Sequence, residues 1–225
     1  NNAAKAVLDW SLSNGYQIIN TGHPLDDYGT AVASPSNAEV LLAYKYQYPN
    51  GNPFYELFNI HSGYQGQRNS MSYYQLTQYY NADGSEPGWP GTESHPYSEY
   101  YDKMQAMEPR YKASAMAAGI DAWNNPNSNY WTSAVVGGSK GWEGCGRRVK
   151  FWYHADTRQW FEYPLYRLAE IYLDLAESYN ELDQPGPALQ NLNVIRQRAG
   201  LPDITETDKD ALRKIIQREW AVEFY

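Results

Sequence analysis

The chain has 225 residues, which is enough for a full hydrophobic core in one large domain or two small ones. A formal net charge of -8 and a mean hydropathy of -0.73 exclude a membrane-spanning chain and argue against a nucleic-acid-binding surface. The 22 tyrosines and 8 tryptophans favour surfaces that stack on a ligand, although tyrosines also fill cores and coat loops.

The first predicted helix covers residues 3–14, and Gly15 ends it. Its predicted apolar face contains Ala6, Val7, Trp10 and Ser11. The pattern is typical of the last helix of a hairpin whose partner would precede Asn1, and no signal peptide is visible. We therefore expect the chain to be an interior piece of a longer protein.

A polar loop is expected next, through His23, Asp26 and Asp27. Residues 38–48 then alternate with a period of two, which predicts a half-buried strand or extended segment. One side of this segment carries Val40, Leu42, Tyr44, Tyr46 and Tyr48.

From Pro49 to Gly146 the chain is rich in Gly, Pro, Asn, Ser and Tyr and has no clear periodicity. Long loops of this kind usually carry function on a scaffold formed by the rest of the chain. Within and just after the region we expect short helices at 73–80 and 98–107, the second capped by Ser98, a turn at 83–84, and a strand at 149–152. Pro and Gly on both sides of Trp89 predict a rigid loop that holds this indole in the open.

Residues 164–201 show the clearest periodicity and predict two amphipathic helices joined by a turn. Pro164 suits the first turn of the first helix, residues 183–187 (DQPGP) separate the two helices, and Gly200 and Pro202 end the second. The first helix has the apolar residues Leu165, Leu168, Ala169, Tyr172, Leu175, Ala176 and Tyr179, and the water-facing residues Arg167, Glu170, Asp174, Glu177 and Glu181. The face of the second helix is Ala188, Leu189, Leu192, Ile195 and Ala199.

The spacing of this hairpin is that of a tetratricopeptide repeat, in which small residues at Ala176 and Ala188 let two helices approach closely. A single repeat buries too little surface to stand alone, so it needs neighbours. An ordinary helical hairpin is the alternative interpretation. A last helix is predicted over 208–225, with Asp208 and Asp210 at its start, and we expect it to pack on the hairpin.

Several segments, in the right order, resemble the SusD/RagB family of outer-membrane nutrient-binding lipoproteins. They are 37–41 (NAEVL), 107–111 (MEPRY), 163–173 (YPLYRLAEIYL), 176–177 (AE), 192–202 (LNVIRQRAGLP), 218–219 (RE) and 222–224 (VEF). Two positions depart from the family pattern and concern local ion pairing. Glu108 replaces the usual aspartate before Pro-Arg, and Trp220 stands where arginine commonly follows the glutamate.

The resemblance implies a mainly α-helical SusD-like fold, with tetratricopeptide-like hairpins as a scaffold, a few short strands and a large loop region that captures a glycan. Residues 1–225 would be part of one such domain. It would comprise the end of a preceding repeat (1–20), the ligand-facing region (37–163), the hairpin (164–202) and a packing helix (207–225). The resemblance also implies a surface-exposed lipoprotein of the outer membrane, anchored through a lipidated cysteine before Asn1, that serves a SusC-like TonB-dependent transporter.

No family motif identifies the ligand-binding rings, so we chose candidates by residue type. Sugars present C–H faces that stack on Trp and Tyr, and their hydroxyls pair with Asn, Gln, Asp and Arg. The first set is Tyr64, Arg68, Asn69, Tyr73, Tyr74 and Trp89, and the second is Trp123, Asn124 and Trp131. Each of them can equally pack internally. By contrast, Arg167, Glu170, Arg196 and Arg198 lie in helix-borne motifs and are interpreted as structural partners that fix helix packing.

We expect neither a metal, a cofactor nor an enzymatic activity. Cys145 is the only cysteine, the histidines (His23, His61, His95 and His154) lack metal-site spacing, and no G-x-S-x-G motif occurs. Asp83, Glu86 and Glu93 share a loop with Trp89 and could suit glycoside hydrolysis, but acids are common in loops. The functional alternatives are binding of a peptide or another nutrient within the same family, and a tetratricopeptide scaffold for protein interactions.

Overall fold

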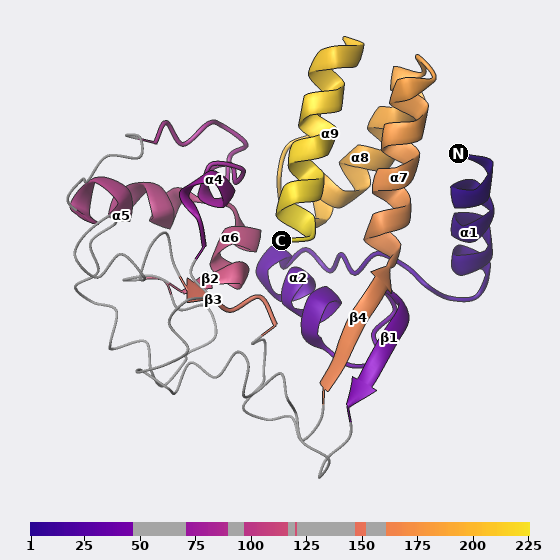
Figure 1. Ribbon diagram of the computed structural model, residues 1–225, viewed down its shortest axis with the longest axis horizontal. Helices are drawn as coiled ribbons and strands as arrows, with labels where there is room; N and C mark the ends of the chain where they lie inside the picture. The colour runs from indigo at the N-terminus through magenta and orange to yellow at the C-terminus, as the bar shows by residue number, and fades with distance from the viewer. Residues whose placement is uncertain (47–70, 90–96, 117–119, 121–146, 152–160) are drawn as a thin grey trace. The chain divides into compact units, whose positions relative to one another are not determined.

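The computed structural model describes residues 1–46, 71–89, 97–116, 120, 147–151 and 161–225 (Figure 1). These residues belong to two compact units: unit 1 contains 1–44 and 162–225, and unit 2 contains 45–161. The described part is mainly α-helical with few strands, as predicted. The candidates Tyr64, Arg68, Asn69, Trp123, Asn124 and Trp131 lie outside the described residues.

The predicted hairpin forms the centre of unit 1. Helix α7 (Leu168–Glu181) and helix α8 (Pro185–Arg198) pack along each other. Asp183 adopts a positive φ of 58° in the turn between them, and Gly200 has φ 73° after α8. Their shared core is Ala169, Leu173 and Ala176 of α7 against Ala188, Leu192 and Ile195 of α8. The alanines at this contact allow the close approach that the sequence predicted.

Helix α9 (Lys209–Glu223) adds Leu212 and Ile216 to the same core, so the prediction of a third helix packed on the hairpin is confirmed. Asp208 caps this helix, because its carboxylate accepts a hydrogen bond from Ala211 N at 2.9 Å.

Helix α7 begins at Leu168, and the prediction that it begins near Pro164 is wrong. Residues Phe161–Arg167 instead form strand β4, which pairs with strand β1 (Val40–Tyr46) in a two-stranded sheet. The arrows of the two strands point in opposite directions in Figure 1, so the pairing is antiparallel. The helical periodicity continues through Leu165, but the pairing partner lies more than 100 residues away and leaves no mark on local periodicity.

Helix α1 (Asn2–Ser13) is present, but its predicted apolar face is wrong except at Ser11, which is buried. The residues turned inward are Ala4, Leu8 and Ser11, and the first two pack on the side of α7 formed by Leu168, Ile171 and Leu175. Val7 is 40% exposed and Trp10 57% exposed. The helix has two stripes with apolar residues, and the one with smaller side chains faces α7.

Helix α2 (Pro24–Ala33) occupies the segment predicted as a polar loop. The Asp27 carboxylate accepts hydrogen bonds from Thr21 N at 2.9 Å, Thr21 Oγ1 at 2.6 Å and His23 N at 3.2 Å. Acidic residues in the first turn suit the positive end of a helix, so the polar residues indicated a helix start and not a loop.

Unit 2 contains helices α4 (Tyr73–Leu76), α5 (Tyr97–Ala106) and α6 (Pro109–Ser114). Strands β2 (Ala115–Met116) and β3 (Arg147–Arg148) pair antiparallel. The prediction of a helix over 73–80 is too long, α5 begins one residue before its predicted cap Ser98, and the strand predicted at 149–152 lies two residues earlier. No helix in the described ranges has both the length and the apolar character needed to cross a membrane.

Candidate functional site

The loop that carries Trp89 is fixed at its start by a tight turn. Gly84 has a φ of 84°, and the Asp83 carboxylate accepts hydrogen bonds from Ser85 N at 2.9 Å and Ser85 Oγ at 2.6 Å. These bonds lower the pKa of Asp83. Ala82 N donates to Ala106 O at 2.8 Å, which joins the loop to the end of α5. The predicted turn at 83–84 is therefore confirmed, and Asp83 has a local structural role.

Trp89 lies against α5 and is only partly exposed. Its ring stacks on the buried ring of Tyr100, with 5.9 Å between centroids and 20° between planes. Lys103 Nζ donates to Pro87 O at 2.8 Å, and Gly88 takes a φ of 61° between them and the indole. The prediction that Trp89 is held in the open therefore needs correction, because one aromatic surface is committed to Tyr100.

The indole nitrogen of Trp89 is a buried donor. Trp89 Nε1 has no hydrogen-bond acceptor among the residues that the structure describes. Trp89 can therefore offer a ligand only the part of its ring that Tyr100 leaves uncovered.

The segment 107–111 contacts the start of the Trp89 loop and carries the buried pair of Glu108 and Arg110. Arg110 Nε and Glu108 Oε2 are 2.6 Å apart, and Glu108 Oε1 accepts from Tyr80 N at 3.1 Å. Glu108 N also donates to Tyr80 O at 2.9 Å. Glutamate at this position thus forms the ion pair and holds the backbone at the start of the Trp89 loop.

Tyr73 and Tyr74 are neighbours on the short helix α4, whose start is capped by Ser72. The Ser72 hydroxyl accepts from Gln75 N at 3.1 Å. Tyr74 is 73% exposed and Tyr73 is partly exposed. Tyr74 is therefore an aromatic ring available for stacking without any rearrangement.

In the described part of unit 2, Trp89 makes its ring contact with Tyr100, and no ring contact joins it to Tyr73 or Tyr74. Within the same limits, no group of three or more His, Cys, Asp or Glu side chains could hold a metal ion.

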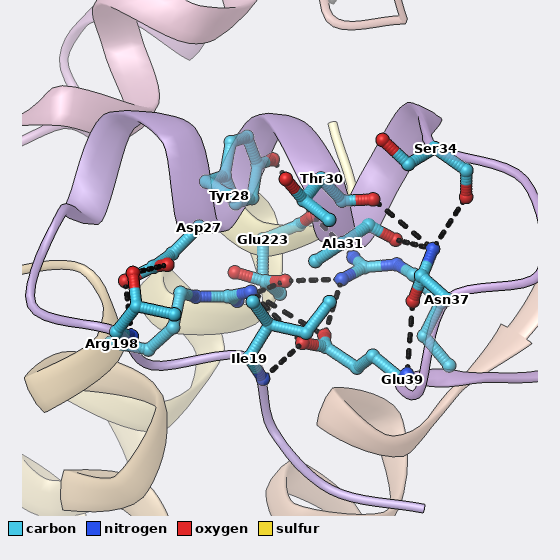
Figure 2. A network of polar contacts seen from close by, with 12 residues as sticks. Ile19, Asp27, Tyr28, Thr30, Ala31, Ser34, Asn37, Glu39, Arg198 and Glu223 are labelled. Atoms are coloured by element: carbon cyan, nitrogen blue, oxygen red, sulfur yellow. Dashed lines mark hydrogen bonds and ion pairs between the residues drawn. The ribbon is translucent and has the colours of Figure 1, made fainter.

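Four buried charges from distant parts of unit 1 form a second polar assembly, here called the four-charge cluster: Glu39, Arg167, Arg198 and Glu223. Figure 2 labels three of them, Glu39, Arg198 and Glu223. Arg167 Nη1 lies 2.9 Å from Glu39 Oε1 and 2.7 Å from Glu223 Oε1. Arg198 Nη1 lies 3.3 Å from Glu39 Oε2, and its Nη2 lies 2.6 Å from Glu223 Oε1. The formal charges of the cluster cancel.

The carboxylates of the cluster favour the charged form of its two arginines. Burial alone would lower the pKa of Arg167 and Arg198, but the carboxylates of Glu223 and Glu39 more than offset burial, so both pKa values lie above the usual range. The Arg167 guanidinium also lies 4.8 Å from the ring centroid of Phe224, and that of Arg198 lies 5.2 Å from the ring centroid of Tyr28.

The sequence predicted that Arg167, Glu170, Arg196 and Arg198 are structural partners, and this is confirmed for the three arginines. Arg167 and Arg198 belong to the four-charge cluster, so the prediction that Arg167 faces water is wrong. Arg196 pairs with the buried Glu219 at 3.2 Å and donates to Pro202 O at 3.0 Å. Glu170 is different, because it is partly exposed and burial, with nearby Asp174, raises its pKa.

The SusD family matches this chain over residues 41–225. The chain belongs to the SusD family. No curated protein sequence matches it. A SusD-like protein from Bacteroides fragilis has a similar crystal structure, with 21% identity and a TM-score of 0.69 over 99% of this chain and 48% of that protein. A SusD-like carbohydrate-binding protein from the same species has 18% identity and a TM-score of 0.60 over 98% of this chain and 45% of that protein.

These likenesses show that the SusD-family chain has the SusD-like fold. The chain spans about half the length of the SusD-like structures that it matches.

Proposed function

We propose that this chain is part of a non-enzymatic cell-surface protein that captures an oligosaccharide or polysaccharide and passes it to a SusC-like TonB-dependent transporter. The observation that carries the proposal is membership of the SusD family over residues 41–225. One solved relative with this fold is described as carbohydrate-binding, which supports a glycan as the ligand.

Capture would use aromatic stacking, assisted by polar side chains. In this proposal Tyr74 and Tyr73 offer exposed or partly exposed rings, and Trp89 offers its remaining surface. The other proposed contacts are Tyr64, Arg68 and Asn69, with Trp123, Asn124 and Trp131 as a second set. For a neutral glycan, stacking would give affinity and amide or guanidinium groups would orient the hydroxyls.

The proposal places the protein at the outer surface of the outer membrane, held there by a lipid anchor in a segment that precedes Asn1. Binding is reversible, and handover to the transporter completes uptake. Copurification of a TonB-dependent transporter after mild detergent extraction would support this placement. Copurification with cytoplasmic proteins only would favour a tetratricopeptide interaction scaffold.

The ligand class is tested with a glycan array and a peptide array, followed by affinity gels that contain the best polysaccharide. Tyr74→Ala is expected to reduce retardation in the gel without changing Tm, because its ring is 73% exposed. Tyr166→Ala is the matched control, since that ring is 51% exposed but belongs to unit 1. Peptide binding without glycan binding would contradict the glycan assignment, and release of reducing ends from the polysaccharide would contradict the absence of catalysis.

A further inference from the structure

The four-charge cluster lies in unit 1, at the ends of β1 and β4 that are farther along the chain from residues 45–161. Glu39 immediately precedes β1, the strand through which the chain leaves unit 1, and Arg167 is the last residue of β4, through which it returns. Arg167 Nη1 and Glu39 Oε1 are 2.9 Å apart, and Leu168 N donates to Glu39 O at 2.8 Å. The two strands are therefore joined at their unit 1 ends by a salt bridge and a backbone hydrogen bond.

Helices α8 and α9 supply the other half of the cluster. Arg198, the last residue of α8, pairs with Glu39, and Glu223, the last residue of α9, pairs with Arg167. Each strand end is thus held by a charge on a helix as well as by the other strand. A further polar contact lies along β4, where Glu162 accepts from Ser36 N at 2.7 Å and Ser36 Oγ at 3.1 Å.

Apolar packing gives the β1–β4 ribbon little support of its own. Leu42 is 52% and Tyr44 56% exposed on β1, and Leu165 is 49% exposed on β4. Leu41 does pack on α7. A two-stranded ribbon with only a partly covered face is marginally stable in water, so it needs another source of order.

We propose that the four-charge cluster is the device that keeps this ribbon closed. It joins Glu39, which precedes β1, to Arg167 at the end of β4 and fastens both to α8 and α9. Loss of the cluster opens the ribbon locally before the helices of unit 1 unfold. The cluster is thus a conformational device, and its role goes beyond a general contribution to stability.

Arg196 provides the control that separates the two roles. It is as buried as Arg167, but it pairs with Glu219 of α9 and Pro202 O, and these contacts involve neither strand. Both Arg167→Met and Arg196→Met remove a buried cation and leave a buried carboxylate. Only the first removes a contact that joins β1 to β4.

The test is native-state hydrogen exchange, measured by mass spectrometry on the full chain. In Arg167→Met, amides of residues 40–46 and 161–167 are expected to exchange at least about tenfold faster than in Arg196→Met, with comparable protection in α7 and α8. Equal ribbon exchange in the two variants, or uniform acceleration across strands and helices in Arg167→Met, would overturn the proposal.

A conservative pair covers the case in which the methionine variants do not fold. Arg167→Lys and Arg196→Lys keep the charge but lose the second guanidinium nitrogen that each arginine uses. Arg167 Nη2 donates to Glu223 O at 3.2 Å, and Arg196 Nε donates to Pro202 O at 3.0 Å. Faster exchange confined to the ribbon is expected in Arg167→Lys alone. Ribbon exchange that matches the unsubstituted chain in Arg167→Lys would also overturn the proposal.

Discussion

Replacement of Arg198 by methionine should cost this chain a large part of its stability. The side chain is fully buried, and its two terminal nitrogens lie 3.3 Å from Glu39 and 2.6 Å from Glu223. Methionine retains most of the apolar stem but no charge, so Arg167 is left as the cation that faces both carboxylates. Removal of one partner from a buried ion pair typically costs about 3–5 kcal/mol.

That loss converts to a fall in Tm of about 10 °C, because each kcal/mol shifts the Tm of a domain of this size by roughly 2–4 °C. Far-UV circular dichroism during thermal and urea unfolding measures the change. Arg213→Met is the matched control, since Arg213 binds both oxygens of Glu181, at 2.6 and 2.8 Å, but on the exposed surface. Its Tm should stay within experimental error, because exposed pairs are screened by water and salt.

The penalty in Arg198→Met arises from an uncompensated buried carboxylate, so a second substitution tests the reason. Addition of Glu223→Gln should recover part of the lost Tm, although it removes a further hydrogen-bonding charge. The reasoning is refuted if Arg198→Met unfolds at the same temperature as Arg213→Met, or if Glu223→Gln adds its full single-variant cost to that of Arg198→Met.

Four other outcomes are expected. Gly200→Ala should lower the free energy of unfolding by about 1–3 kcal/mol in urea titrations, because φ is 73° and a Cβ would lie 2.8 Å from Pro24 Cγ; an unchanged midpoint would contradict this. Asp208→Ala should cost about 1 kcal/mol in the same titration through loss of the α9 cap, whereas Asp208→Asn should cost much less. Trp89→Ala should reduce both Tm and glycan affinity, since the ring stacks inside the protein; a loss of affinity at constant Tm would show that the stack contributes nothing to stability. Asp174→Asn should raise Tm at pH 7 but not at pH 3, because burial and then Glu177 raise the pKa of Asp174 in the folded protein. The contribution of the protonated Asp174 to stability is complete below the unfolded pKa and is lost as pH rises through the folded pKa. Equal shifts in Tm at both pH values would contradict this.

The helices with a clear local periodicity were predictable from the sequence, because apolar residues three and four positions apart mark a helix face within a short window. The hairpin α7–α8 and helix α9 are of this kind. Strand β4 could not be predicted from the sequence, because Pro164 and Leu165 continue the helical pattern and pairing with β1 decides their conformation. Helix α1 has two stripes with apolar residues, and its sequence does not show which one is buried. The position of α7 decides this.

The composition of the candidate site stays a prediction, and its geometry could not be predicted from the sequence. Aromatic rings and loop residues are visible in the sequence, but the stacking of Trp89 on Tyr100 depends on how a loop lies against a helix. The two glutamates of the four-charge cluster were also missed. Glu39 and Glu223 each stand within a short apolar run, and an acid in such a position signals a buried cationic partner.

The β1–β4 ribbon also affects how the protein can diversify. All of residues 45–161 depart from and return to the helical unit through one pair of adjacent strands. Insertions, deletions or wholesale exchange between those strands leave the residues that pack α7, α8 and α9 unaltered. If the proposed function holds, mutation can explore new ligand preferences in one contiguous stretch of gene.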